Sequence, residues 1–193
     1  LPIVPSLATN WNISPDGMSY TFKLREGVKF HDGTTFGAED VKASYQRIVF
    51  PPTGLVSLRI LPIKEMVVRG PYSIEMKLSQ PRDSYTFLGA LAGGWNVITS
   101  KEALDKSGGD LKQVDNFPGT GPFVYKNRTT ESWEMVRNPN YWNPHAPYVD
   151  RIVHVWLKAW TPALAAALLG GQVDWGMWLD PSAYQKVKAS ANM

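Results

Sequence analysis

The residue types that most often carry catalysis or bind metals are few in this 193-residue sequence. There is no cysteine, which removes disulfides, thiolate metal sites and cysteine nucleophiles. The three histidines, His31, His145 and His154, lack the spacing of metal ligands, and none forms an i, i+4 pair on a predicted helix. His31 lies in a predicted turn, where we expect a local hydrogen-bonding role. The sequence therefore predicts no metal site.

Paired carboxylates and phosphate-binding loops are also missing. Glu39 and Asp40 are neighbours at the start of a predicted helix, so they face different ways and do not form an acid–base pair. Residues 119–122 (GTGP) lack the lysine of a phosphate loop and precede a predicted strand in place of a helix. We expect no catalytic residue, no cofactor and no enzymatic activity.

Aromatic residues are abundant, with eight Trp and eight Tyr. Their large, flat side chains have few rotatable bonds, which suits ligand clefts as well as cores. Trp95 follows two glycines, while Trp175 and Trp178 lie at the end of a predicted strand. Loops and strand ends are where ligand-binding groups gather on a rigid scaffold. These three residues are candidate ligand contacts, and burial in a core is the alternative for each.

The elements that would position these residues form an α/β mixture. Alternation of apolar and polar residues predicts strands, and apolar residues at i, i+4 and i+7 predict helices. The expected strands are 7–13, 18–24, 63–69, 73–78, 123–126, 133–137, 152–157 and 173–177. The expected helices are 38–49, 81–91, one capped by Ser100, 161–169 and 181–188. This order predicts antiparallel pairs first and β-α-β-α units later.

Charge and hydropathy exclude other classes of protein. The formal charge is only +3, and the basic residues are scattered, so we expect no binding to nucleic acid. No stretch approaches the roughly 20 apolar residues that span a bilayer. Residues 1–5 lack the charged and apolar regions of a signal peptide. We therefore expect either a cytosolic protein or one whose leader has been removed.

Several short motifs follow one another in an order that resembles a known family. They are residues 7–11 (LATNW), 14–17 (SPDG), 20–33 (YTFKLREGVKFHDG), 38–41 (AEDV), 119–123 (GTGPF), 137–142 (RNPNYW) and 168–174 (LLGGQVD). This series closely resembles the solute-binding proteins of family 5, which are receptors of ABC importers for peptides, nickel chelates and some sugars. One departure is Gly37, which stands where the family usually has a Ser or Thr helix cap, and glycine is tolerated there.

The resemblance implies an α/β fold, as a fragment of the periplasmic-binding-protein type II fold with mixed sheets and flanking helices. Residues 1–98 would form the accessory subdomain of the first lobe. Residues 99–193 would form part of its α/β sheet domain, and the second lobe would be absent. That second lobe usually pairs with the peptide termini, so we expect this chain alone to bind no peptide tightly.

The resemblance also implies the function of a substrate-binding component of an ABC importer. Such a protein is periplasmic or anchored at the cell surface, captures peptides there, and delivers them to a membrane permease. We expect it to be a monomer at full length. The implied ligand contacts are Trp95, Asn96, Met177 and Trp178, and the segment 55–58 would lie near the same cleft.

Other functions stay open at this point. An oligosaccharide ligand would suit the many aromatic residues, and a nickel chelate would suit other members of the family. A receptor that signals in place of importing would use the same fold. A carbohydrate-processing module would need two carboxylates converging on one cleft, and the sequence has no motif for such a pair.

Overall fold

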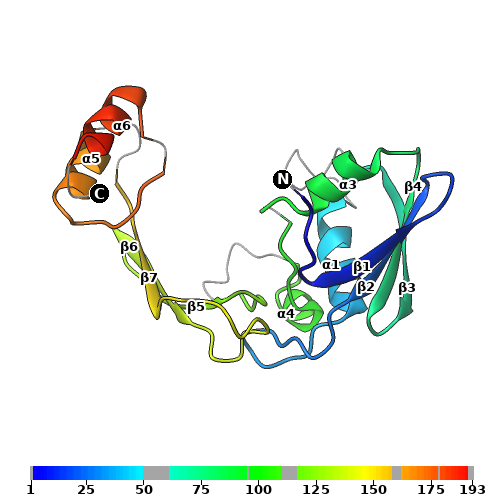
Figure 1. Ribbon diagram of the computed structural model, residues 1–193. Coiled ribbons are helices and arrows are strands. Elements are labelled where there is room, and N and C mark those ends of the chain that lie inside the picture. The colour runs from blue at the N-terminus through cyan, green and yellow to red at the C-terminus, as the bar shows by residue number, and fades with distance from the viewer. Residues whose placement is uncertain are drawn as a thin grey trace. The chain divides into compact units, whose positions relative to one another are not determined.

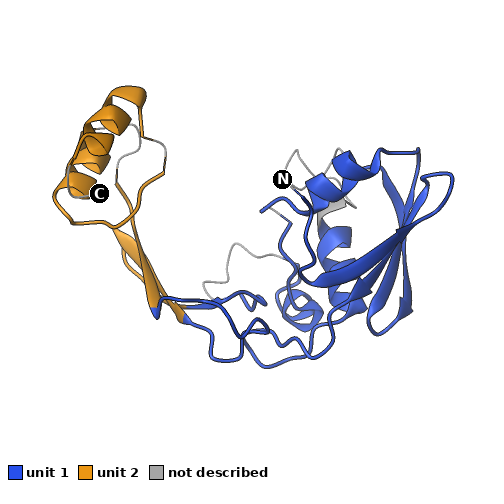
Figure 2. Ribbon diagram, viewed as in Figure 1, with its two compact units in different colours: residues 1–124, 137–150 blue, residues 125–136, 151–193 orange. Residues whose placement is uncertain are grey.

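The computed structural model describes residues 2–49, 61–94, 96–109, 117–157, 162–177 and 179–190. The chain divides into two compact units, which Figure 2 shows in two colours. Unit 1 comprises residues 1–124 and 137–150, and unit 2 comprises residues 125–136 and 151–193. The expected boundary between residues 98 and 99 concerns the subdomains of a longer receptor and stays a prediction.

Unit 1 is built on a four-stranded antiparallel sheet with the order β1-β2-β4-β3 (Figure 1). The strands are β1 (Ala8–Ile13), β2 (Ser19–Leu24), β3 (Ile63–Gly70) and β4 (Ser73–Leu78). Successive side chains of a strand point to opposite faces, and alternate residues of β2 and β4 are buried. Tyr20 pairs with Met76, and Phe22 pairs with Ile74. These residues form the centre of the core of unit 1.

The turn between β1 and β2 is fixed by Asp16. Its carboxylate accepts hydrogen bonds from Oγ of Ser14 at 2.5 Å and from the backbone N–H of Met18 at 3.0 Å. The hydrogen bond from Ser14, and to a smaller extent the one from Met18, lowers the pKa of the Asp16 carboxyl. Gly17 has a φ of 68°, a conformation that costs glycine little. The predicted turn at residues 14–17 is confirmed.

Helix α1 (Ala38–Val49) has the bounds that the sequence predicts, and it packs against β3 and β4. Asp40 in its first turn accepts hydrogen bonds from the N–H of Gly37 and from the N–H of Lys101, each at 2.8 Å. Lys101 begins α4 (Lys101–Lys106), which lies beside α1 in Figure 1. One carboxylate therefore ties together the starts of two helices.

Helix α3 (Ser84–Leu91) contributes an aromatic side chain to this core. Phe87 is buried, and its ring centroid lies 4.5 Å from that of Tyr20. The carboxylate of Asp83 caps the helix, because it accepts from N and Oγ1 of Thr86 at 2.8 and 2.9 Å. The predicted start of this helix at residue 81 is wrong, since the cap places the first helical residue at Ser84.

Three segments that are distant in the sequence meet at the carbonyl of Gly121. The N–H of Gly119 donates to Nδ1 of His31 at 3.3 Å, so the ring proton lies on Nε2, which donates to the oxygen of Gly121 at 3.0 Å. Nδ2 of Asn138 donates to the same oxygen, also at 3.0 Å. The predicted local role of His31 is wrong, because these partners stand 88 and 90 residues away.

The segment after Asn138 is anchored by aromatic contacts in unit 1. The guanidinium of Arg25 lies 4.3 Å from the ring centroid of Trp142, within the range of a cation–π interaction. The rings of Tyr141 and Trp142 are 5.1 Å apart, and Trp142 packs against the core. The contacts of these two aromatic residues therefore hold the loop in unit 1.

Unit 2 contains most of a three-stranded sheet and two helices. The sheet has the order β5-β6-β7, with β5 (Phe123–Arg128), β6 (Ser132–Arg137) and β7 (Arg151–Val155). The helices are α5 (Pro162–Leu169) and α6 (Pro181–Lys188), and they pack through Ala165, Leu168, Ala183 and Val187. The carboxylate of Asp180 caps α6 by accepting from the N–H groups of Ser182 and Ala183.

The predicted strand at residues 173–177 is wrong. The N–H groups of Gln172 and Val173 donate back to the carbonyl of Ala167, and Val173 packs against the α5–α6 core. These N–H groups are therefore used in hydrogen bonds to the end of α5, and the segment does not form a strand. Asp174 is exposed, and the predicted β-α-β-α order does not form here.

Truncation of Phe87 tests the aromatic contact in the core of unit 1. We expect Phe87→Ala to lower the free energy of unfolding by about 3–5 kcal/mol, because it leaves a cavity beside Tyr20. Phe87→Leu keeps most of the apolar volume and should cost clearly less. Urea denaturation followed by circular dichroism measures both changes, and a loss below about 1 kcal/mol for Phe87→Ala would contradict the packing.

The cap at Asp83 should make stability depend on pH. Hydrogen bonds from the backbone and then the side chain of Thr86 lower the pKa of this carboxyl. A lowered folded-state pKa stabilises the fold above the ordinary pKa of Asp, and this stabilisation is lost as pH falls through the lowered value. Asn caps helices as well but does not titrate. The midpoint of thermal unfolding of Asp83→Asn should therefore approach that of the wild type between about pH 6 and pH 2. A constant difference over this range would contradict the assignment.

Candidate functional site

An apolar cavity of about 710 Å³ lies in unit 1, between the N-terminal segment, the sheet and α3. Its volume is in the range of roughly 300–1,000 Å³ that is typical of small-molecule sites. The described residues that line it are Pro2, Ile3, Val4, Ser6, Leu7, Ala8, Trp11, Phe22, Leu24, Val41, Tyr45, Ile74, Met76, Tyr85, Leu88, Gly89, Leu91, Ala92, Gly93, Asn96 and Ile98.

The first wall of the cavity is the N-terminal segment, which Arg25 holds in place. The N–H of Arg25 donates to the carbonyl of Leu7 at 2.7 Å, and its Nε donates to the carbonyl of Ser6 at 3.0 Å. Because the same guanidinium contacts Trp142, the wall is joined to the rest of unit 1 through one arginine.

The second wall is α3 and the turn that follows it. The N–H of Gly93 donates to the carbonyl of Ala90 at 3.2 Å, and the N–H of Asn96 donates to the carbonyl of Gly93 at 3.0 Å. Nδ2 of Asn96 also donates to the carbonyl of Ala90. A Cβ atom on Gly93 would lie 3.2 Å from that carbonyl and 3.6 Å from Nδ2 of Asn96, so the tight turn favours glycine.

Few polar atoms of the described residues reach the cavity. Tyr45 is buried, and burial raises the pKa of its hydroxyl, which keeps the phenol neutral. Oδ1 of Asn96 has almost no accessible surface, so it does not face the cavity, and it has no hydrogen-bond partner among the described residues. An acceptor left unpaired in an apolar setting is costly unless a donor reaches it.

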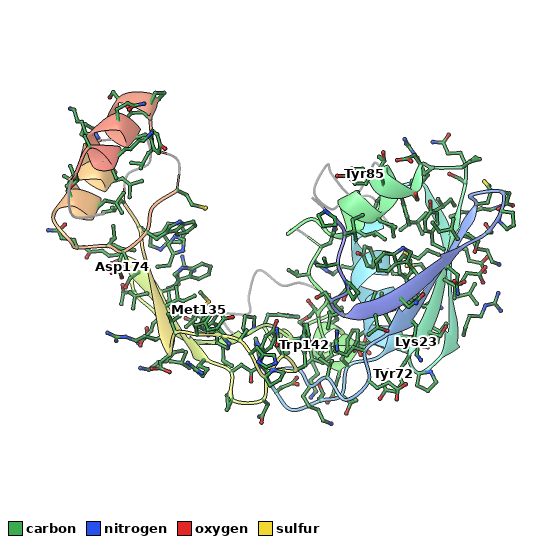
Figure 3. The ribbon with its side chains drawn as sticks, in the orientation of Figure 1. Lys23, Tyr72, Tyr85, Met135, Trp142 and Asp174 are labelled. Atoms are coloured by element: carbon green, nitrogen blue, oxygen red, sulfur yellow. The ribbon has the colours of Figure 1, made fainter. Side chains whose placement is uncertain are left out.

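A second hollow in unit 1 has a different character. Its volume is about 650 Å³, and it is lined by Asn10, Asn12, Thr21, Lys23, Glu26, Gly70, Pro71, Tyr72 and Ser73. Figure 3 shows Lys23 and Tyr72 at the lower part of unit 1, whereas Tyr85, which lines the apolar cavity, lies above them on α3. The charged lysine and glutamate make this hollow polar, so the two differ in the groups that they could hold.

The structure places two of the predicted ligand contacts. Asn96 lines the apolar cavity of unit 1, and Met177 is a half-exposed residue of unit 2. Trp95, Trp178 and the segment 55–58 lie outside the described residues. Trp175 is largely exposed, which contradicts burial in a core for this residue. The role of Asn96, Met177, Trp95 and Trp178 in ligand binding stays a prediction.

The sequence reasoning missed most of the lining of the cavity. Ile3 and Leu7 belong to an N-terminal segment for which no role in ligand contact was predicted. Leu88 and Leu91 belong to a helix that was predicted without any role in ligand contact. A signal was available for the helix, since Leu88 and Leu91 are three residues apart and precede two glycines. No pattern in the sequence brings residues 2–7 over α3.

Neither a metal-binding cluster nor a membrane-spanning helix is present among the described residues. Within the described ranges, no group of three or more His, Cys, Asp or Glu side chains is placed to hold a metal ion. None of the helices described is long and apolar enough to cross a bilayer.

Comparison with known proteins gives the family. A family model described as bacterial extracellular solute-binding proteins, family 5 middle, matches residues 2–193. The glutathione-binding protein GsiB of Escherichia coli K12 is 34% identical over 149 residues, which cover 76% of this chain and 28% of GsiB. The chain thus spans less than a third of the length of this relative.

Solved structures agree with the family model. The periplasmic binding protein DppA of Helicobacter pylori, in complex with the peptide STSA, is 30% identical with a TM-score of 0.75. The match covers 89% of this chain and 37% of DppA. NikZ of Campylobacter jejuni, in complex with Ni(L-His), is 27% identical with a TM-score of 0.80, and the match covers 97% of this chain and 37% of NikZ.

The expected α/β fold of a periplasmic binding protein is confirmed by these structural neighbours. The resemblance drawn from the signature motifs is confirmed by the family model over nearly the whole chain. The chain belongs to the bacterial extracellular solute-binding proteins of family 5.

Proposed function

We propose that the protein containing this chain is the substrate-binding component of an ABC importer and that it captures peptides outside the cytoplasmic membrane. The observation that carries this proposal is the family match over residues 2–193. The similarity to a binding protein that holds the peptide STSA favours peptides among the ligands of the family. The similarity to GsiB favours them too, because glutathione is itself a tripeptide.

The proposed mechanism is capture without chemistry. Two lobes close on the solute and exclude water, and a membrane permease receives the closed form. Closure is a shift between open and closed populations, and the ligand drives it only as far as its affinity differs between them. Such a protein needs no catalytic residue and no cofactor, and it acts as a monomer in the periplasm or at the cell surface.

In this chain, residues 1–98 would be the accessory subdomain of the first lobe, and residues 99–193 would be part of its sheet domain. The apolar cavity supports a role of unit 1 in ligand contact, because it has the volume of a small-molecule site and Asn96 lines it. Trp95 and Trp178 would add aromatic walls, and Met177 would add an adaptable apolar contact.

A nickel chelate is the second candidate ligand. The structural similarity to NikZ in complex with Ni(L-His) favours it, since that match covers nearly all of this chain. An oligosaccharide rests only on the abundance of aromatic residues and is the weaker alternative.

The ligand can be identified directly from the protein. We expect native mass spectrometry of the complete product of the gene that encodes this chain to show bound species, which denaturation releases as a set of short peptides. The 193-residue chain alone is the control. It should release little, because the groups that pair with the peptide termini would lie in the second lobe. Release of a nickel chelate or a sugar would overturn the peptide assignment, as would a protein that stays empty when peptides are added.

A further inference from the structure

The sheet of unit 1 has a polar face on the side opposite its core. Tyr20, Phe22 and Leu24 of β2 are buried, and the residues that alternate with them point to the other side. Residues paired directly across two strands share a face, so this polar face continues from β2 into β1 and β4. Phe22 and Leu24 line the apolar cavity from the core side, so the sheet separates that cavity from the polar hollow. The residues of the three strands that line the polar hollow of about 650 Å³ are Asn10, Asn12, Thr21, Lys23 and Ser73.

The strand register places these five side chains in two rows. Lys23 stands between Asn10 and Ser73, and Thr21 stands beside Asn12. Neighbours across two strands are about 5 Å apart, and next-but-one residues along a strand are about 7 Å apart. The rows therefore form a compact polar floor with hydrogen-bonding groups in two directions.

The turn between β3 and β4 supplies a wall that is fixed in advance. The carbonyl of Tyr72 accepts from the N–H of Leu24, and the carbonyl of Pro71 accepts from the N–H of Ala38, each at 2.8 Å. The side chain of Tyr72 is half-buried against the core and lines the hollow, and Figure 3 labels it together with Lys23. An aromatic ring held in this way needs no ordering when a ligand packs on it.

The side chains of the hollow differ from their neighbours on the same face in having no partners. Outside the hollow, Glu75 accepts from Ser19 and from Arg69, and Lys77 donates to Glu65. Seven side chains of the hollow make no hydrogen bond and no ion pair with any described residue, and they are Asn10, Asn12, Thr21, Lys23, Glu26, Tyr72 and Ser73. Their donors and acceptors are therefore available to a ligand.

The chemistry of these groups favours an uncharged ligand with many hydroxyls. The side chains of Asn, Thr, Ser and Tyr each both donate and accept hydrogen bonds. The one lysine and the one glutamate of the hollow cancel in charge, so neither an anion nor a cation gains a net attraction. The hydroxyls of a sugar also both donate and accept, and the C–H face of its ring packs on an aromatic side chain. Phosphate or a metal ion would use few of the groups present.

We propose that the polar hollow is a second binding site of this protein and that it takes an uncharged saccharide. The sugar ring packs on Tyr72, and its hydroxyls bind Lys23 and the amides of Asn10 and Asn12. This site goes beyond the proposed function, because it lies across the sheet from the apolar cavity and needs no captured solute.

Binding can be measured on the 193-residue chain by two-dimensional amide NMR. The probes are maltotriose, cellotriose and chitotriose. Inorganic phosphate and N-acetyl-triglycine amide, an uncharged peptide, are added at the same concentrations as controls. We expect at least one saccharide to shift the amides of residues 10–12, 21–26 and 70–73 with a dissociation constant of about 0.1–10 mM. Neither control should shift these amides to a comparable extent.

Two lysines on the same face of the sheet supply a matched pair of variants. Lys23 lines the hollow, whereas Lys77 pairs with Ser19 at the other end of β2 and does not line it. Lys23→Ala should weaken binding of the saccharide by about tenfold, because a hydrogen bond to a charged group is lost, and Lys77→Ala should leave it within about twofold. Tyr72→Leu keeps an apolar side chain against the core but removes the ring, and we expect a loss of about three- to tenfold.

The outcomes separate this inference from the proposed function. Absence of shifts at the lining with all three saccharides would overturn the site. Equal binding of phosphate or of the blocked peptide would overturn the assignment to an uncharged saccharide, and equal losses in the two lysine variants would overturn its location. Failure of peptide capture would show instead in the ligand that the complete protein retains through purification, and a saccharide held at about 1 mM is not retained. If a variant does not fold, the comparison of probes on the wild-type chain still decides.

Discussion

The carbonyl oxygen of Gly121 is the point on which the organisation of unit 1 depends. It accepts hydrogen bonds from His31 and from Asn138, which come from opposite parts of the sequence. Backbone bonds strengthen the same junction, since the N–H of His31 donates to the carbonyl of Gly119 and the N–H of Asn138 donates to that of Pro122. Asn138 is itself buried, so loss of its partner would leave a polar group unpaired in the interior. The junction explains why residues 137–150 belong to unit 1 although β6 and β7 on either side of them contribute to unit 2.

Residues at and next to this junction hold a wall of the apolar cavity in place but do not line the cavity themselves. Trp142 follows Asn138 closely and packs on Arg25, and Arg25 holds the N-terminal wall through the carbonyls of Ser6 and Leu7. His31 and Asn138 are likewise absent from the lining. The signature motifs of the family in this region therefore fix the scaffold, and some of their residues, such as Leu7, Trp11 and Phe22, line the cavity as well.

The elements that were predicted well are those in which a local pattern decides the structure. The alternation of Tyr20, Phe22 and Leu24 marks β2, and the bounds of α1 follow from its apolar spacing and its first-turn carboxylates. Predictions failed where distant contacts decide. His31 binds a loop about ninety residues away, and Val173 packs on a helical pair although its neighbours resemble a strand. For the site, the sequence indicated Asn96 but not the apolar residues of the described lining, because the N-terminal wall is placed by Arg25 and by no pattern of its own.

The most direct test of this account is a double-mutant cycle at the Gly121 junction. His31→Ala and Asn138→Ala are made singly and together, and the free energy of unfolding is measured by urea denaturation. We expect each single variant to lose about 1–3 kcal/mol and the two effects to be coupled by more than about 0.5 kcal/mol, because both side chains serve one carbonyl. His31→Ala combined with Asp180→Ala in unit 2 is the control, and this pair should be additive. Additivity of His31→Ala and Asn138→Ala within about 0.5 kcal/mol would contradict the claim that one carbonyl holds these segments together.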